Sequence, residues 1–216
     1  MIESVPGRWW PSLRPAPVRT GAGSLHSGLA LALVAVLATV TRAGAGGEPA
    51  GAYPDAPPAG FSGGFGESTC HACHFTAEPN SGPGSVELIG LPEAYEPDQR
   101  YAITVQLVRP GLVLGGFQLT ARYAETGAQA GTLEAAPEDA ERVGVTVNRD
   151  VAYAHHRLPG TIPVSTDTAR WTILWTAPGE GAGSVLFHVA ANAADGDEST
   201  YGDVIFTAES AIAAGE

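Results

Sequence analysis

An alternation of apolar and polar residues with a period of two is the feature that most constrains the fold of this chain. Along 101–107, Tyr, Ile, Val and Leu alternate with Ala, Thr and Gln. Such alternation is typical of β-strands that pack one face against a core, and it argues against long amphipathic helices in the same segments. The clearest alternating segments, each bounded by Gly, Pro or Asp, are 101–107, 117–123, 171–176, 185–189 and 204–208.

Shorter segments at 85–89, 128–134 and 143–147 add further candidate strands. We expect about seven to nine short strands in total, without helical periodicity between them, as in an antiparallel β-sandwich. The predicted fold class is therefore all-β. One antiparallel β-sandwich is expected over 84–212, preceded by a short and mostly irregular segment. A region of this size can bury enough core to fold as one domain.

The N-terminal region has the organisation of a secretory signal. Three arginines precede an apolar run at 28–40, and Ala43-Gly44-Ala45 follows it. The run is shorter than the roughly 18 apolar residues that a transmembrane helix requires. We predict that 1–45 is a signal peptide and that the protein is exported, to the periplasm or to the outside of the cell. The alternative is an uncleaved N-terminal anchor, and no membrane span is expected after cleavage.

Between the signal and the sandwich lie two segments of irregular composition. Residues 46–69 are rich in Gly, Pro and Ala, which predicts a flexible leader. Residues 70–83 begin with Cys70-His71-Ala72-Cys73-His74 and run into a Pro, Asn and Gly cluster that breaks regular structure. Any helix in this second segment is therefore short, about two turns.

The C-x-x-C-H spacing is the attachment pattern of a c-type haem. Two thiols three positions apart can add to the two vinyl groups on one edge of the porphyrin, and the adjacent imidazole then becomes the proximal iron ligand. The sequence holds no other cysteine. We predict one covalent haem c, held by Cys70 and Cys73, with His74 as the proximal ligand. A plain disulfide, a thioredoxin-like redox pair and half of a zinc site are the alternatives.

Several separated stretches resemble, in their order, the bacterial Reeler-like domain, also called the choice-of-anchor V domain. The resemblance covers about 64–210 and implies a secreted, Reelin-domain-like β-sandwich of poorly defined biochemical role. The C-x-x-C-H belongs to the family pattern, as does a Tyr-x-x-His that corresponds here to Tyr153 and His156. The matching stretches are 66–74, 84–86, 116–121, Trp171 with 175–178, 191–197 and 202–207.

The second axial position of the iron has few candidates. Met1 is the only methionine and leaves with the signal, which excludes His/Met ligation in the mature chain. Neighbouring strand residues point to opposite faces, so at most one of His155 and His156 can face a haem. The family spacing favours His156 as the candidate distal ligand, with a hydrogen-bonded structural role as its alternative. His188 is expected to be structural.

The charge is strongly negative. The chain has 23 acidic and 11 basic residues, a formal net charge of −12, and no lysine. Such a surface disfavours nucleic acid and anionic membranes as partners and would suit a basic redox partner protein. An acidic cluster at 195–203 departs from the spacing of an EF-hand, so a solvated turn is expected there rather than a calcium site.

The favoured function is an exported monohaem c-type protein that transfers electrons. Because no Ser/His/Asp motif, phosphate-binding loop or carboxylate pair stands out, an electron carrier is favoured over an enzyme. One alternative is a secreted binding or adhesion module in which a Cys70–Cys73 disulfide closes a loop and no haem is bound. Another is a haem-based sensor or small redox enzyme with an open iron site.

Overall fold

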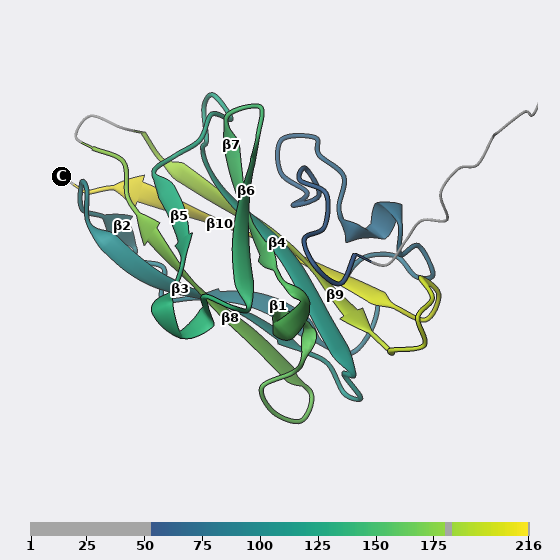
Figure 1. Ribbon diagram of the computed structural model, residues 1–216. Coiled ribbons are helices and arrows are strands. Elements are labelled where there is room, and N and C mark those ends of the chain that lie inside the picture. Colours follow the sequence, from purple (N-terminus) through teal and green to yellow (C-terminus); the bar gives the residue numbers. More distant parts are fainter. Residues whose placement is uncertain (1–52, 180–182, 216) are drawn as a thin grey trace, which may run out of the picture. The chain divides into compact units, whose positions relative to one another are not determined.

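The computed structural model describes residues 53–179 and 183–215 (Figure 1). The predicted signal peptide, 1–45, and the first part of the predicted leader lie outside the described residues. No helix within the described ranges has the length and apolar character needed to cross a membrane.

Strands dominate the described chain, and the helices are single short turns of 3-10 type. The strands are β1 (Ser85–Ile89), β2 (Ala94–Tyr95), β3 (Arg100–Val108), β4 (Leu114–Tyr123), β5 (Thr132–Ala135), β6 (Val143–Asn148), β7 (Val151–His156), β8 (Thr168–Thr176), β9 (Val185–Ala194) and β10 (Val204–Ala214). The short helices are η1 (Cys70–Ala72), η2 (Pro137–Asp139) and η3 (Leu158–Thr161).

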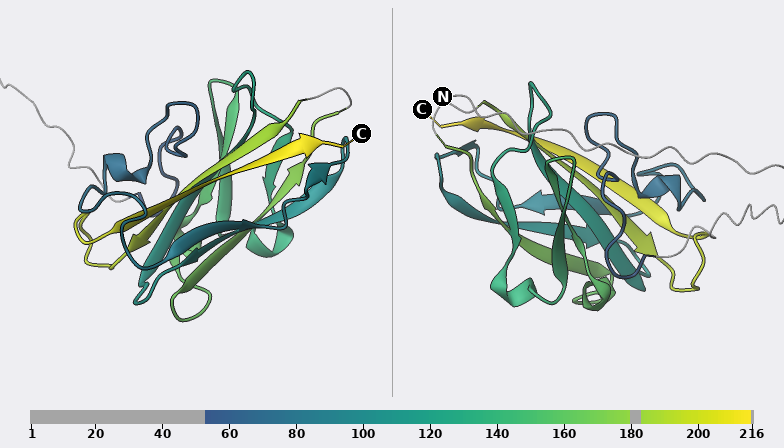
Figure 2. Two further views of the ribbon diagram at one scale, coloured as in Figure 1. Left: turned by 180° about the vertical axis from the view of Figure 1, so that it is seen from behind. Right: turned by 45° about the horizontal axis from the view of Figure 1, so that its top comes forward.

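These strands form two sheets that pack face to face as a β-sandwich (Figures 1 and 2). The four-stranded sheet has the order β1-β3-β8-β5, and the six-stranded sheet has the order β2-β10-β9-β4-β7-β6. Within the described residues every strand pairing is antiparallel except the short contact of β10 with β2. The predicted all-β sandwich class is therefore confirmed, with one small parallel pairing that the sequence pattern did not indicate.

Besides β7, which was not among the candidate segments, two strands differ from the sequence prediction. The first is β2, whose two residues are too few to show any period. The second is β5, which was expected from residue 128 and begins only at Thr132. The reason is Gly131, whose φ is +69° and whose added Cβ would lie 2.1 Å from the Thr176 carbonyl oxygen. A residue in this left-handed conformation cannot continue a strand, and only glycine adopts it at so close an approach.

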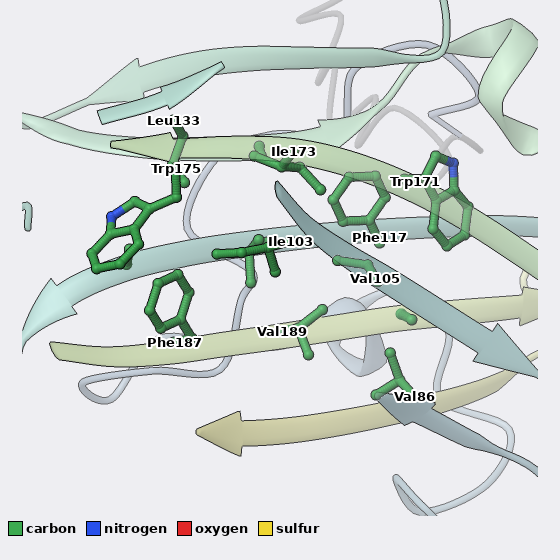
Figure 3. Packing of buried hydrophobic residues seen from close by; sticks show 14 of the residues in the cluster. Val86, Ile103, Val105, Phe117, Leu133, Trp171, Ile173, Trp175, Phe187 and Val189 are labelled. Carbon is green, nitrogen blue, oxygen red and sulfur yellow. The ribbon is translucent and has the colours of Figure 1, made fainter. Parts of the chain in front are cut away.

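The core lies between the two sheets and consists of the apolar positions of the alternating segments (Figure 3). Trp171, Trp175 and Ile103 from the four-stranded sheet face Phe117 and Phe187 from the six-stranded sheet, and none of the five is more than 1% exposed. Both indole N–H groups donate to backbone carbonyls, at 2.8 and 2.9 Å. Burial of each such side chain stabilises the fold by about 1.5–3 kcal/mol.

The second face of β4 is covered by the segment that the sequence predicted as a flexible leader. Strand β4 is buried at seven successive positions, whereas a strand with one face in water would alternate. Its outward residue Gln118 accepts hydrogen bonds from the backbone N–H groups of Gly60 and Phe61, at 3.0 and 2.6 Å. The described part of the leader is thus hydrogen-bonded to the sheet through the Gln118 side chain.

Candidate functional site

The C-x-x-C-H motif folds as one tight turn beside the outer face of the six-stranded sheet. The Thr69 hydroxyl begins the turn by accepting from the His71 N–H at 3.2 Å. The Cys70 carbonyl ends it by accepting from the Cys73 and His74 N–H groups, at 3.2 and 3.0 Å. The turn is shorter than the two turns expected, and it brings Cys70 and Cys73 to the wall of the same pocket.

This pocket has a volume of about 250 Å³ and brings together all four residues that the sequence singled out. Cys70, Cys73 and His74 come from the motif, and His156 comes from the end of β7. The rest of the lining consists mostly of apolar side chains and of the backbone of glycines. It includes Tyr53, Pro54, Pro57, Pro58, Phe61, Leu114, Gly115, Gly116, Phe117 and Ala194.

His74 is held by a buried carboxylate. Its Nδ1 lies 2.6 Å from Asp203 Oδ2, and the Asp203 side chain is only 1% exposed. The Asn192 amide Nδ2 donates to the same Oδ2 at 3.0 Å. A carboxylate that accepts at Nδ1 fixes the tautomer of an imidazole and leaves the Nε2 lone pair for another partner. The His74 ring is thus prepared to ligate a metal through Nε2.

The two cysteines are free thiols in the structure. Burial is the main cause that raises the pKa of the Cys70 thiol to about 12. Catalytic thiol pairs such as those of thioredoxin-like proteins need a lowered pKa, because the thiolate is the reactive form. The shift at Cys70 has the opposite direction, and the thioredoxin-like alternative is therefore disfavoured.

His156 lies on the sheet side of the pocket with both ring nitrogens engaged. Its Nδ1 accepts from the Phe117 N–H at 3.0 Å, and its Nε2 lies 3.1 Å from the Tyr53 carbonyl oxygen. Burial is the main cause that lowers the His156 pKa below its usual 6.5. The neutral ring packs on Gly116, where an added Cβ would lie 2.8 Å from Cε1. Gly116 therefore makes room for the imidazole.

The other histidines of the sheet do not line the pocket. His155 bonds the His156 carbonyl through Nδ1 at 2.8 Å and the Thr146 hydroxyl through Nε2 at 3.0 Å. His188 pairs through Nε2 with Glu209 at 2.7 Å. Of these three histidines, only His156 lines the pocket.

Residues 53–61, here called the strap, form one wall of the pocket. Gln118 accepts two strap N–H groups through Oε1, and its Nε2 donates to the Pro58 carbonyl at 2.9 Å. Near its start, the strap carboxylate of Asp55 accepts from the Leu158 N–H at 3.1 Å. The strap is therefore fixed at several points by side chains and backbone of the sandwich.

A second polar cluster fixes the segment between the strap and the motif. Glu67 pairs with Arg122 at 2.7 Å and also accepts from the hydroxyls of Tyr153 and Ser62, at 2.5 and 2.9 Å. Burial and the bond to Glu67 raise the pKa of Tyr153 to about 12. Glu67 stands three residues before Cys70, so this cluster joins the segment that leads into the C-x-x-C-H turn to the sheet.

The acidic loop at 195–203 does not gather its carboxylates around one point. Asp197 accepts from the Ser199 N–H at 2.8 Å, and Asp195 accepts from the Asp197 N–H at 3.2 Å, as turn residues do. Asp203 turns inward to His74. In the described part of the chain, no group of three or more His, Cys, Asp or Glu side chains is arranged to hold a metal ion.

No family model matches the chain, and no curated protein matches it. Among solved structures, it is similar to the reeler domain of human F-spondin, with a TM-score of 0.44 and 21% identity over 61% of this chain and 89% of that one. The Reelin-N domain of F-spondin gives 0.47 and 20%, over 68% and 98%. A cohesin module of a family 33 glycoside hydrolase from Clostridium perfringens gives 0.43 and 8%, over 62% and 97%. Scores this low assign neither family nor function, and the β-sandwich rests on the strand pairing itself.

Three site residues escaped the sequence analysis: Asp203, Glu67 and Gln118. Asp203 was noticed only as a member of an acidic loop, and its partner His74 is distant in the sequence. All three lie within the stretches 66–74, 116–121 and 202–207, where the resemblance to the Reeler-like domain is found. Polar residues inside those stretches are the signal that could have identified them.

Proposed function

We propose that this protein is an exported monohaem c-type cytochrome-like protein in which a Reeler-like β-sandwich holds one covalent haem and serves electron transfer. The observation that carries the proposal is the pocket, since both cysteines, His74 and His156 line it together. A disulfide that only closes a loop would not require a pocket beside it. Nor would it require a buried carboxylate behind the adjacent histidine.

The residues present fit a haem. Cys70 and Cys73 are free, so each thiol can add across one vinyl group: a carbon–sulfur bond forms, and the thiol hydrogen passes to the other vinyl carbon. His74 offers Nε2, because Nδ1 is engaged by Asp203. The largely apolar lining suits a flat aromatic ligand. When bound, the haem would supply a one-electron redox couple.

His156 is the proposed second axial ligand. Its ring is neutral and lines the same pocket, as a ligand to iron must. Ligation through Nε2 requires that this nitrogen leave the Tyr53 carbonyl, to which it now donates. Ligation through Nε2 would therefore require the start of the strap to shift. It would also require the proton to move from Nε2 to Nδ1, which would then donate to the Phe117 carbonyl oxygen, 3.3 Å away, instead of accepting from the Phe117 N–H.

The test is the mass and the spectrum of the protein produced in a host with cytochrome c maturation. We expect an intact mass greater by one haem, absorption bands that persist after acid–acetone extraction, and loss of both in Cys70→Ser/Cys73→Ser. In the haem-loaded protein, His156→Ala should convert a six-coordinate low-spin spectrum to high spin, while the matched His155→Ala should not.

A mass two hydrogens below that of the reduced chain, without visible absorption, would contradict the haem proposal. That result would instead favour the secreted binding or adhesion module with a Cys70–Cys73 disulfide. Binding of carbon monoxide by the reduced parent protein would favour an open iron site over ligation by His156.

A further inference from the structure

We propose that Asp203 is a positioning residue that orients His74 and raises its donor strength toward the iron. This inference rests on the proposed haem function. Asp203 lies directly before β10, whereas His74 follows the C-x-x-C-H turn, so the pair joins two distant parts of the chain. Both residues line the same pocket as His156.

The geometry selects Asp203 rather than Asn192 as the partner of His74. Asn192 Nδ2 lies 3.3 Å from His74 Nδ1, but Asp203 Oδ2 lies 2.6 Å from it. An amide Nδ2 carries only donors, so the proton on Nδ1 can be accepted by the carboxylate alone. Among the described residues Asn192 Oδ1 has no partner, whereas its Nδ2 donates to Asp203 and so orients the amide.

The loop before β10 is shaped to bring this carboxylate inward. Gly202 has φ +87°, and an added Cβ there would lie 2.3 Å from Asp195 Oδ2. No larger residue fits this conformation at that approach without displacing Asp195. The second carboxylate oxygen, Oδ1, accepts from the Asp195 N–H at 3.3 Å. Both carboxylate oxygens of Asp203 thus accept hydrogen bonds, which restrict rotation of the carboxylate away from His74.

The chemical consequence follows from hydrogen bonding at Nδ1. A carboxylate acceptor fixes the Nδ1–H tautomer and increases the basicity of Nε2. A more basic axial ligand stabilises the oxidised iron more than the reduced iron. Asp203 therefore lowers the reduction potential of the bound haem, beyond the general effect of a negative charge near the pocket.

The first test needs no haem. In the parent protein without haem, nitrogen NMR of the imidazole of His74, assigned with His74→Gln, should show a fixed Nδ1–H tautomer. Asp203→Asn should remove that preference. A parent spectrum with the proton on Nε2, or with rapid exchange between both nitrogens, would overturn the proposal even if the variant fails to fold.

The second test uses the haem-loaded protein. Asp203→Asn should raise the reduction potential, whereas Asp197→Asn, the same charge change at an exposed position of the same loop, should leave it unchanged. Equal shifts in both variants would overturn the proposal, because they would reflect charge alone. Failure of haem attachment in the parent would instead contradict the proposed function, and the tautomer measurement would still decide whether Asp203 orients His74.

Discussion

The interior of the sandwich and the pocket beside it are built from different interactions. Between the sheets, apolar side chains such as Trp175 and Phe187 pack without exposure to water. Around the pocket, the arrangement depends on directional polar pairs, among them Glu67 with Arg122 and His74 with Asp203. Apolar packing tolerates small changes of geometry. A hydrogen bond is lost when its two atoms move apart by a fraction of an ångström or when one of them is replaced.

Because of this difference, we expect some substitutions to destabilise the whole fold and others to disrupt only the pocket. Removal of a core side chain should weaken the whole molecule, because the two sheets share one core. Removal of a polar partner near the pocket should release the strap or the motif and leave the sandwich formed.

The largest effect is expected in the core. Trp175→Ala should lower the free energy of unfolding by about 3–5 kcal/mol, since it opens a cavity between the sheets. Urea unfolding followed by circular dichroism would measure it. Phe75→Ala is the control on the pocket side of the molecule, where the ring is 52% exposed. A change within about 0.5 kcal/mol is expected for it, and similar losses in both variants would contradict the division described above.

A smaller effect is expected at the polar cluster before the motif. Glu67→Gln should cost about 1–3 kcal/mol, because Arg122 and the Tyr153 hydroxyl lose a charged acceptor. Limited proteolysis should show earlier cleavage within 61–69, with the sandwich intact. Glu134→Gln is the matched control, since its pair with Arg100 is exposed at 55% and 57%. That pair should contribute less than about 1 kcal/mol to stability. Equal decreases in the free energy of unfolding for both variants would show that the Glu67 pair does not hold this segment on the sheet.

The smallest effect is a dependence on pH that belongs to the pocket alone. The folded His156 has a lowered pKa, so the unfolded chain takes up a proton first as the pH falls. Stability due to this group is therefore present above pH 6.5 and is lost as the pH decreases toward the folded pKa. Unfolding measured from about pH 7.5 to 5 should show a smaller loss in His156→Gln than in the parent. Trp175→Ala should retain the parent's pH dependence, and parallel curves for parent and His156→Gln would refute the assignment.

The same contrast explains what the sequence could predict. Alternation along 101–107 and 171–176 follows from burial of one face, so it identified β3 and β8 and the buried tryptophans. It failed for β5 at Gly131, where a close approach to another strand decides the backbone. The motif of Cys70, Cys73 and His74 could be recognised because its residues lie close together in the sequence.

The rest of the site could not be derived locally. The composition of the leader predicted flexibility. Its backbone is instead bonded to Gln118, which belongs to β4, so the leader's own residues could not indicate this contact. Asp203 looked like one of several loop carboxylates, since only the paired sheet brings it to His74. Bonds between distant residues leave no period in the sequence, and the geometry that selects one partner exists only in the folded chain.

The contact between His74 and Asp203 spans 129 positions, which has a consequence for the order of events during synthesis and folding. The motif is synthesised well before its buried partner, so this part of the molecule is completed only after Asp203 has been made. Until then Cys70 is exposed and retains a thiol pKa near the ordinary 9.0, whereas folding raises it to about 12. Any modification that needs the Cys70 thiolate is therefore favoured in the nascent chain and suppressed in the finished protein.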